Sequence, residues 1–236
     1  MSSRTYRNER RNIKNKDPIG DISNVYGFGP KTIIELKTNY NINNIRTLRS
    51  YVRKLPDIVS RTQRVGLRYH NRTNKKIPRT EATKHVKFIK KHLPRAVIAG
   101  SYIREVKKVG DLDIIIMKDL NAAVEKLKKA NYIIEDLVYG DQKYSGIVCI
   151  PRTEKYRKID IIETTKSEMP FALLYFTGDY IQNITMRQKA KKMGYILNHK
   201  GIMYNKTKKY VKGIKTEKDI FKFLEMKYLT PRERSH

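Results

Sequence analysis

The sequence predicts an α+β protein with a mixed or antiparallel sheet. Short runs rich in β-branched residues predict the strands, and amphipathic runs predict the helices that cover them. The expected strands are 96–99, 111–117, 132–138, 142–150 and 156–162, with a helix at 120–129. Helical patterns dominate before residue 78. After residue 166 the pattern predicts two helices, a hairpin at 194–203 and a capped helix at 216–224.

Composition limits the classes of function. The chain has 236 residues, with 52 Lys and Arg against 23 Asp and Glu, so its net charge is +29, yet 39% of its residues are hydrophobic. A folding chain of this charge is expected to bind a polyanion, because neutralising phosphates releases counterions. A ribosomal-type structural protein or a membrane-surface binder would also be basic, but neither explains the carboxylates described next.

Two carboxylates are expected to converge on one strand. In the run 111–117, alternation along a strand puts Asp111 and Asp113 on the same face. Such a pair would repel and be costly to bury unless a cation lay between them. Hard oxygen ligands suit Mg²⁺ or Mn²⁺ when substrate phosphates complete the coordination. The strand at 156–162 offers a third carboxylate, Asp160.

A phosphate-binding turn is predicted just before these carboxylates. Gly100 and Ser101 follow the strand 96–99 and lead into a short helix that carries Arg104. Backbone N–H groups, a hydroxyl and a guanidinium suit phosphate oxygens. Carboxylates, metal and phosphate site together predict nucleotidyl transfer.

Several motifs now resemble one family. Gly100-Ser-Tyr-Ile-Arg104, Gly110-Asp-Leu-Asp113 and Lys158-Ile-Asp160 resemble the palm motifs of nucleotidyltransferases, particularly the DNA polymerase beta-like family X DNA polymerases. Tyr175-Phe-Thr-Gly178, with Asn183 and Arg187 after it, resembles the nucleotide pocket of that family. The resemblance covers about residues 21–234 and implies the family's fold, with a palm, a helix-hairpin-helix subdomain and a thumb-like subdomain.

The helix-hairpin-helix element is expected within residues 22–36. Gly27 and Gly29 would form a tight turn, and Pro30 suits the first turn of the next helix. Close approach of this turn to a phosphate would bind the DNA backbone without reading its sequence. The resemblance implies that the carbonyls of Ser23, Val25 and Phe28 share Na⁺ or K⁺ with a DNA phosphate.

The resemblance also implies roles for individual residues. Asp111 and Asp113 would hold both of two Mg²⁺ ions, for which Mn²⁺ can substitute, and Asp160 only the catalytic one. The expected dNTP-binding residues are Lys76, Gly100, Ser101, Arg104, Gly110, Tyr175, Phe176, Gly178, Tyr180 and Asn183. The expected DNA-binding residues are Gly27, Gly29, Lys31, Lys143 and Arg187.

The expected domains are a basic disordered tail (1–16), a helical DNA-binding subdomain (17–77), the palm (78–166) and a nucleotide-selection subdomain (167–236). Too few residues precede the hairpin element for the lyase domain of many relatives, so we expect no dedicated lyase activity. Compact family members occur in large DNA viruses, and the many Lys, Asn, Ile and Tyr residues agree with an AT-rich genome.

Together these features predict a template-directed DNA polymerase that fills short gaps in base excision repair. One alternative is an RNA-tailing or terminal nucleotidyltransferase, which the Tyr175–Phe176 pair opposes. Another is an inactive DNA-binding scaffold, which the intact carboxylates oppose. Expected partners are gapped or primer-template DNA, dNTPs and a DNA ligase, with no membrane, and we expect a monomer.

No signal peptide or membrane span is predicted, and Cys149 stands alone, which excludes an internal disulfide and a cysteine-based zinc site. The expected location is therefore intracellular, in nucleus or cytoplasm, or in a virus factory or virion for a viral protein. His85 and His92 share a helix face and are expected at the surface or a boundary rather than at a metal.

Overall fold

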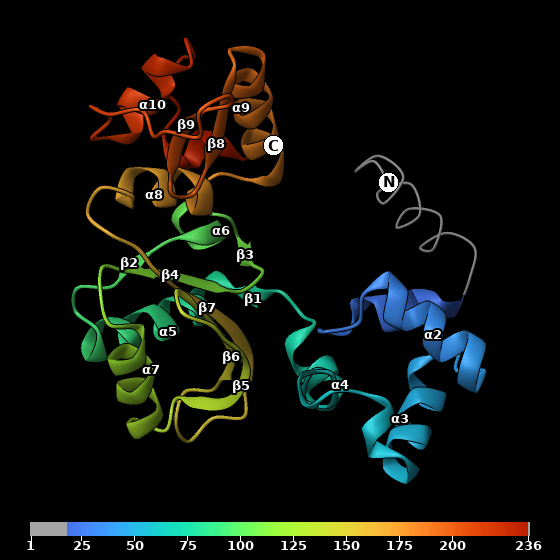
Figure 1. Ribbon diagram of the computed structural model, residues 1–236. Helices are drawn as coiled ribbons and strands as arrows, with labels where there is room; N and C mark the ends of the chain where they lie inside the picture. Colours follow the sequence, from blue (N-terminus) through green and yellow to red (C-terminus); the bar gives the residue numbers. More distant parts are fainter. Residues whose placement is uncertain (1–17, 236) are drawn as a thin grey trace. The chain divides into compact units, whose positions relative to one another are not determined.

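The structure is a computed structural model that describes residues 18–235. The chain forms two compact units, Met1–Lys75 and Lys76–His236, and each is described by itself (Figure 1). The predicted disordered tail lies outside the described residues. None of the helices within residues 18–235 combines the length and apolar character that a membrane crossing requires.

The first unit is helical. Its elements are η1 (Pro18–Asn24), α2 (Pro30–Tyr40), α3 (Ile45–Lys54), η2 (Pro56–Ile58) and α4 (Arg61–Thr73). Local chemistry fixes the helix starts. Pro30 occupies the first turn of α2, and the Asn44 side chain accepts from the Thr47 N–H at the start of α3. Ser60 and Gln63 form a capping box on α4.

An apolar core holds these helices together. Its fully or nearly fully buried members are Ile22, Val25, Phe28, Ile33, Leu36, Ile42, Leu48, Val59 and Leu67. A short 3₁₀ turn at Pro56–Ile58 precedes α4, which starts at Arg61 because Ser60 supplies its N-cap.

The second unit contains a five-stranded sheet in the order β2 (Val97–Ile98), β4 (Leu112–Ile116), β7 (Arg157–Glu163), β6 (Lys143–Val148) and β5 (Ile133–Tyr139). Strands β4 and β7 are parallel, and the other neighbouring pairs are antiparallel. Helices α5 (Arg79–His92) and α7 (Leu120–Lys129) pack beside it (Figure 1). The prediction of an α+β fold with a mixed sheet is confirmed.

A separate two-stranded sheet and a one-turn helix accompany the five-stranded sheet. Strand β1 (Ile77–Pro78) pairs antiparallel with β3 (Lys108–Val109), and the one-turn helix α6 (Gly100–Ile103) follows β2. The sequence pattern did not predict the β1–β3 pair, because each strand has only two residues. Strand β3 ends two residues before Asp111.

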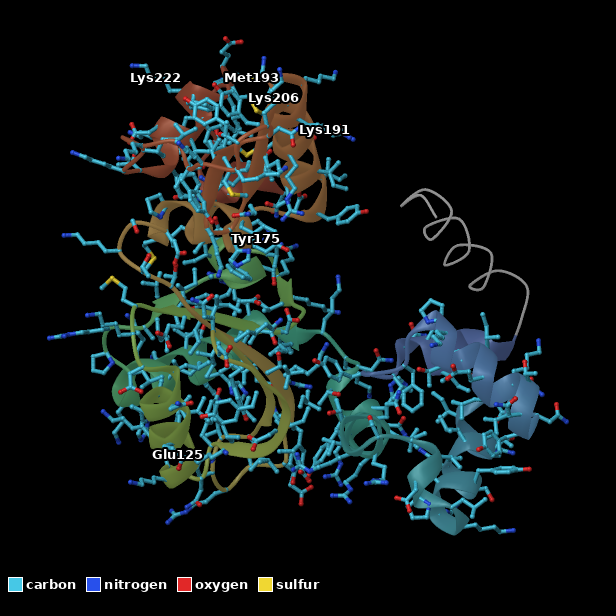
Figure 2. The ribbon with its side chains drawn as sticks, viewed as in Figure 1. Glu125, Tyr175, Lys191, Met193, Lys206 and Lys222 are labelled. Atoms are coloured by element: carbon cyan, nitrogen blue, oxygen red, sulfur yellow. The ribbon has the colours of Figure 1, made fainter. Side chains whose placement is uncertain are left out.

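The C-terminal part begins with α8 (Met169–Thr177) and α9 (Tyr180–Lys192), continues through the hairpin β8 (Tyr195–Asn198) and β9 (Gly201–Tyr204), and ends with α10 (Glu217–Phe223) and η3 (Pro231–Arg234). Arg234 is fully buried and ties this end together. Its guanidinium donates to the Thr177 hydroxyl at 2.7 Å and to the carboxylate of Glu217. Figure 2 shows Tyr175 near the start of this part and Lys206 on its outer side.

The expectation that His85 is a surface or boundary residue is wrong. Its ring is fully buried, and Nδ1 lies 2.8 Å from the Tyr132 hydroxyl. Burial lowers the pKa of His85 to about 4, so the ring is neutral in the folded protein at pH 7. His85 is thus a core hydrogen-bonding residue on α5.

Candidate active site

The three predicted carboxylates, Asp111, Asp113 and Asp160, gather at one end of the sheet. Asp113 on β4 lies directly opposite Asp160 on the parallel neighbour β7. Asp111 precedes β4, which begins at Leu112. Side chains of residues directly opposite each other on neighbouring strands share a face. We refer to these three residues as the carboxylate cluster.

Gly100 allows Asp113 its position. Gly100 has a φ of +65°, and a Cβ placed on it would lie 1.9 Å from Oδ2 of Asp113. Both the backbone conformation and the space therefore require glycine. The Ala99 N–H donates to the Asp113 carbonyl at 2.9 Å, which fixes the end of β2 against β4.

The charges of the carboxylate cluster would favour a bound cation. Burial, together with the charges of Asp111 and Asp160, raises the pKa of Asp113 to about 8. Burial also raises the pKa of Asp111, and the charge of Asp160 raises it further. Such mutual repulsion costs stability in a site without metal, and a divalent cation would relieve it.

Asp160 has two further partners. The buried Ser145 hydroxyl donates to Oδ1 at 2.6 Å, and Lys143 Nζ lies 2.9 Å from Oδ2. Lys143 was predicted to contact DNA, and the structure places its ammonium on a carboxylate of the cluster. No sequence motif singled out Ser145, although alternation along β6 puts it on the same face as Lys143.

The donor set fits a metal that substrate completes. Within residues 18–235, no three His, Cys, Asp or Glu side chains form a ready-made metal cage. Mg²⁺ typically takes one or two carboxylates plus phosphate oxygens and water, so a closed cage is not expected. The cluster supplies hard oxygen donors, and one of these, Oδ2 of Asp160, is held by Lys143.

Two of the predicted phosphate-binding residues, Ser101 and Arg104, lie beside the cluster. Ser101 accepts a 3.4 Å hydrogen bond from the Gly110 N–H, so these two residues adjoin. Arg104 donates to the carbonyls of Thr177 and Gly178, at 3.1 and 3.4 Å, and its buried Nε has no partner. Lys76 is exposed, in the residue before β1. Their contacts with a nucleotide remain predictions.

The predicted nucleotide pocket is built on α8 and α9. The rings of Tyr175 and Phe176 pack edge to face with centroids 4.8 Å apart, and the Arg187 guanidinium lies 4.9 Å from the Tyr175 ring centre. The Asn183 amide donates to the Tyr175 carbonyl at 2.9 Å, which ties the two helices together. Tyr180, at the start of α9, is 63% exposed.

His199, which no sequence motif singled out, also lies at this pocket. Its ring centre lies 5.8 Å from that of Tyr175 and 6.3 Å from that of Phe176. Burial and the charge of Lys200 lower its pKa. A lone histidine in a turn gives no local sequence signal of function. The contact of His199 with Tyr175 and Phe176 becomes apparent only from the position of the hairpin β8–β9 in the fold.

The predicted DNA-backbone residues occupy the first unit. Gly27 has a φ of +90°, and its carbonyl accepts a 3.0 Å hydrogen bond from Gln63. Val25 and Phe28 are buried in the core of this unit, and the Phe28 N–H donates to the Val25 carbonyl at 3.3 Å. These bonds define the tight turn that precedes α2.

The remaining predicted residues of this unit are more open. Ser23 lies in η1, and Gly29 is the residue before α2, where a Cβ would meet no atom within 4 Å. Lys31 is highly exposed and lies 3.9 Å from Glu35. An exposed lysine at the start of a helix is available to a phosphate, and its contact with DNA remains a prediction.

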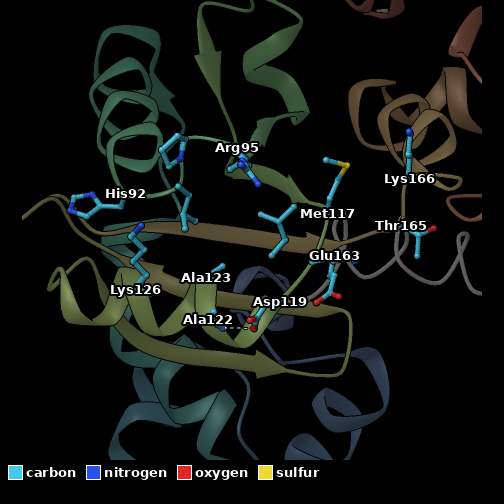
Figure 3. Close-up of a pocket in the computed structure, with 15 residues that line it drawn as sticks. His92, Arg95, Met117, Asp119, Ala122, Ala123, Lys126, Glu163, Thr165 and Lys166 are labelled. Atoms are coloured by element: carbon cyan, nitrogen blue, oxygen red, sulfur yellow. Dashed lines mark hydrogen bonds between the residues drawn. The ribbon is translucent and has the colours of Figure 1, made fainter.

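A separate cavity lies elsewhere in the second unit (Figure 3). It measures about 840 Å³ and lies between the end of α5, the start of α7 and the far end of β4. Asp119 and Glu163 line it, but their carboxylates accept from the backbone N–H groups of Ala122 and Leu120 and so cap α7. None of the cluster carboxylates lines this cavity.

Comparisons with known proteins agree with this geometry. A family model described as DNA polymerase beta palm matches residues 76–166, and one described as DNA polymerase beta thumb matches residues 172–235. Solved Leishmania infantum polymerase beta, in a ternary gap complex, superposes with a TM-score of 0.83 at 26% identity, covering 93% of this chain and 90% of that one.

Curated relatives include DNA polymerase lambda of Arabidopsis thaliana, 29% identical over 89% of this chain and 45% of its own length. The rat (Rattus norvegicus) DNA polymerase lambda is 27% identical over 94% of this chain and 43% of its own length. Repair DNA polymerase X of African swine fever virus is 29% identical over 63% of this chain and 84% of its own length. The chain therefore spans less than half the length of the two lambda polymerases.

The mixed sheet, with carboxylates paired across two parallel strands beside a glycine-serine turn, defines a nucleotidyltransferase palm. The palm and thumb models together match well over half of the chain. The chain belongs to family X of the DNA polymerases, the family of polymerases beta and lambda. The resemblance inferred from the sequence is thereby confirmed.

Proposed function

We propose that this protein is a template-directed DNA polymerase that fills short gaps in DNA during repair. The observation that carries the proposal is the carboxylate cluster, with Asp113 and Asp160 opposite each other on adjacent parallel strands. Relatives named as repair and lambda polymerases, and the neighbour solved with gapped DNA, support the same activity.

Family X polymerases depend on divalent metal ions. We assign Asp111 and Asp113 to both of two Mg²⁺ ions and Asp160 to the catalytic one, with Mn²⁺ as a substitute. When bound, the ions neutralise charge on the attacking and leaving oxygens of an in-line transfer. Asp160 would also accept the proton of the primer 3′-hydroxyl. Oxygen donors and the raised pKa of Asp113 support this assignment.

Other residues would position the dNTP. Ser101 and Arg104 would bind the triphosphate and stabilise the charge of the departing pyrophosphate. To do so, Arg104 would exchange its present partners, the carbonyls of Thr177 and Gly178, for phosphate oxygens. Tyr175 and Phe176 would lie against the sugar and exclude a 2′-hydroxyl by bulk. Asn183 would contact the base edge, and Arg187 the template strand.

The first unit would hold the DNA backbone without sequence preference. The positive φ of Gly27 and the exposed Lys31 support a phosphate contact there, with Na⁺ or K⁺ at the carbonyls of Ser23, Val25 and Phe28. We further propose that the protein acts as a monomer inside the cell, together with a DNA ligase.

A primer-extension assay tests the proposed function. A labelled primer on a one-nucleotide-gapped duplex would receive each dNTP or rNTP separately, with Mg²⁺. We expect only the dNTP complementary to the template to be added. Untemplated or ribonucleotide addition would instead indicate a tailing enzyme, and no addition with any nucleotide would indicate an inactive DNA-binding scaffold.

A further inference from the structure

Three residues form one row across the neighbouring strands β4, β7 and β6. Asp113 on β4 lies opposite Asp160 on β7, and Asp160 lies opposite Ser145 on β6. Residues opposite each other on neighbouring strands project from the same face, so this row leads from the carboxylate cluster directly to a hydroxyl. Ser145 is only 2% exposed. A buried hydroxyl at this position needs a hydrogen-bond partner, and Asp160 supplies it.

Two different donors hold the two oxygens of Asp160. Ser145 donates to Oδ1 at 2.6 Å, and Lys143 Nζ lies 2.9 Å from Oδ2. Lys143 is two residues before Ser145 on β6 and therefore lies on the same face. A carboxylate held at both oxygens has little rotational freedom, so its orientation is set before any substrate arrives.

The two donors differ in how easily they can leave. Ser145 is buried in a central strand, on a short side chain that cannot reach another position. The Lys143 side chain is half exposed, and its long stem allows the ammonium to swing away. Ion pairs with this exposure contribute little stability and exchange readily.

We propose that Ser145 is a positioning residue that fixes the orientation of Asp160, and that Lys143 is an exchangeable counter-ion which a divalent cation replaces at Oδ2. The inference rests on the proposed function in assigning Asp160 to the catalytic metal. In the absence of metal, the Lys143 ammonium offsets the repulsion within the cluster, because it lies 2.9 Å from Oδ2 of Asp160. Ser145 keeps its hydrogen bond throughout.

Metal binding without DNA tests the role of Lys143. Mn²⁺ would be titrated into the full chain and free Mn²⁺ followed by electron paramagnetic resonance. Lys143→Gln removes the competing ammonium, so we expect Mn²⁺ to bind about threefold more tightly than in the wild type. Lys206→Gln removes one exposed positive charge far from the cluster and serves as the matched control. Unchanged or weaker binding by Lys143→Gln would overturn this role.

Turnover and metal binding together test the role of Ser145. Ser145→Ala is expected to lower kcat for gap filling about tenfold with KM for the dNTP unchanged, because a hydrogen bond to a charged group is lost. It should also weaken Mn²⁺ binding about threefold, since the freed carboxylate must be ordered on binding. Ser145→Thr keeps the hydroxyl and should restore both values. Ser167→Ala, an exposed serine elsewhere, is the control.

The outcomes separate the inference from the proposed function. A folded Ser145→Ala variant with wild-type kcat, or a loss that Ser145→Thr does not restore, would overturn the positioning role. The proposed function would then stand if the wild type extends primers. A wild type that adds no nucleotide would overturn the function, whereas opposite changes in Mn²⁺ affinity for Lys143→Gln and Ser145→Ala would still support the inference.

Discussion

At the scale of single residues, glycine at position 100 decides whether Asp113 can occupy its place. The positive φ of Gly100 disfavours any side chain, and the space that a Cβ would need is filled by the Asp113 carboxylate. A side chain at position 100 would therefore strain the backbone and also collide with the Asp113 carboxylate. A substitution here displaces the cluster itself.

We therefore expect Gly100→Ala to lower primer extension about 100-fold, because a displacement near 1 Å at a reacting group has that effect. It should also destabilise folding by about 1–3 kcal/mol through backbone strain. Single-turnover rates and thermal unfolding would measure both. Gly140→Ala, whose Cβ would meet its nearest atom at an ordinary 3.6 Å, is the control. Wild-type rates for Gly100→Ala would contradict this account of the turn.

At the scale of elements, buried polar side chains on helix α5 hydrogen-bond to residues of the sheet and of the segment before it. His85 lies against Tyr132, just before β5, while Glu81 one turn earlier accepts a 2.7 Å hydrogen bond from Arg157 at the start of β7. Burial opposes ionisation of Glu81, but the bond and charge of Arg157 outweigh it and lower the pKa. Arg157 and Lys155 also oppose protonation of His85.

This arrangement predicts a pH dependence of stability. The pKa of His85 falls from 6.5 in the unfolded chain to about 4 in the folded protein, so only the unfolded chain binds a proton between these values. Stability contributed by neutral His85 is complete above pH 6.5 and falls by about 3 kcal/mol as the pH drops to 4. The stability that ionised Glu81 contributes is lost at lower pH, below its ordinary pKa of 4.5, as the carboxylate becomes protonated.

The variant His85→Gln separates the two effects, because glutamine still reaches Tyr132 but does not titrate. Urea unfolding at several pH values should show a shallower loss of stability between pH 6.5 and 4 for this variant than for the wild type. An identical pH dependence in both proteins would mean that His85 does not carry it.

At the scale of the whole molecule, the fold class and most elements could be predicted because their signals are local. The β-branched runs, the Asn44 cap and the Thr216 capping box all act within a few residues, and the structure places helices or strands there. Long-range contacts left no such signal. The burial of His85 and the pairing of Lys143 and Ser145 with Asp160 depend on which strands become neighbours.

The candidate site divides in the same way. Asp111, Asp113 and Asp160 could be selected from motifs, and the structure brings them to one end of the sheet. The partners that set their geometry could not be selected, because a serine within a strand and a histidine in a turn are common in any sequence. The net charge of +29 agrees with a DNA partner but identifies no residue.

The central claim is that the carboxylate cluster performs templated nucleotidyl transfer. It is tested most directly by the single-turnover rate of templated dNTP addition to a gapped duplex by Asp113→Asn, which keeps the shape of the side chain and removes its charge. Asp141→Asn, at an exposed position, is the control. We predict a rate at least about 100-fold below the wild type for Asp113→Asn with normal folding, and a wild-type rate for Asp141→Asn. A wild-type rate for Asp113→Asn would contradict the claim.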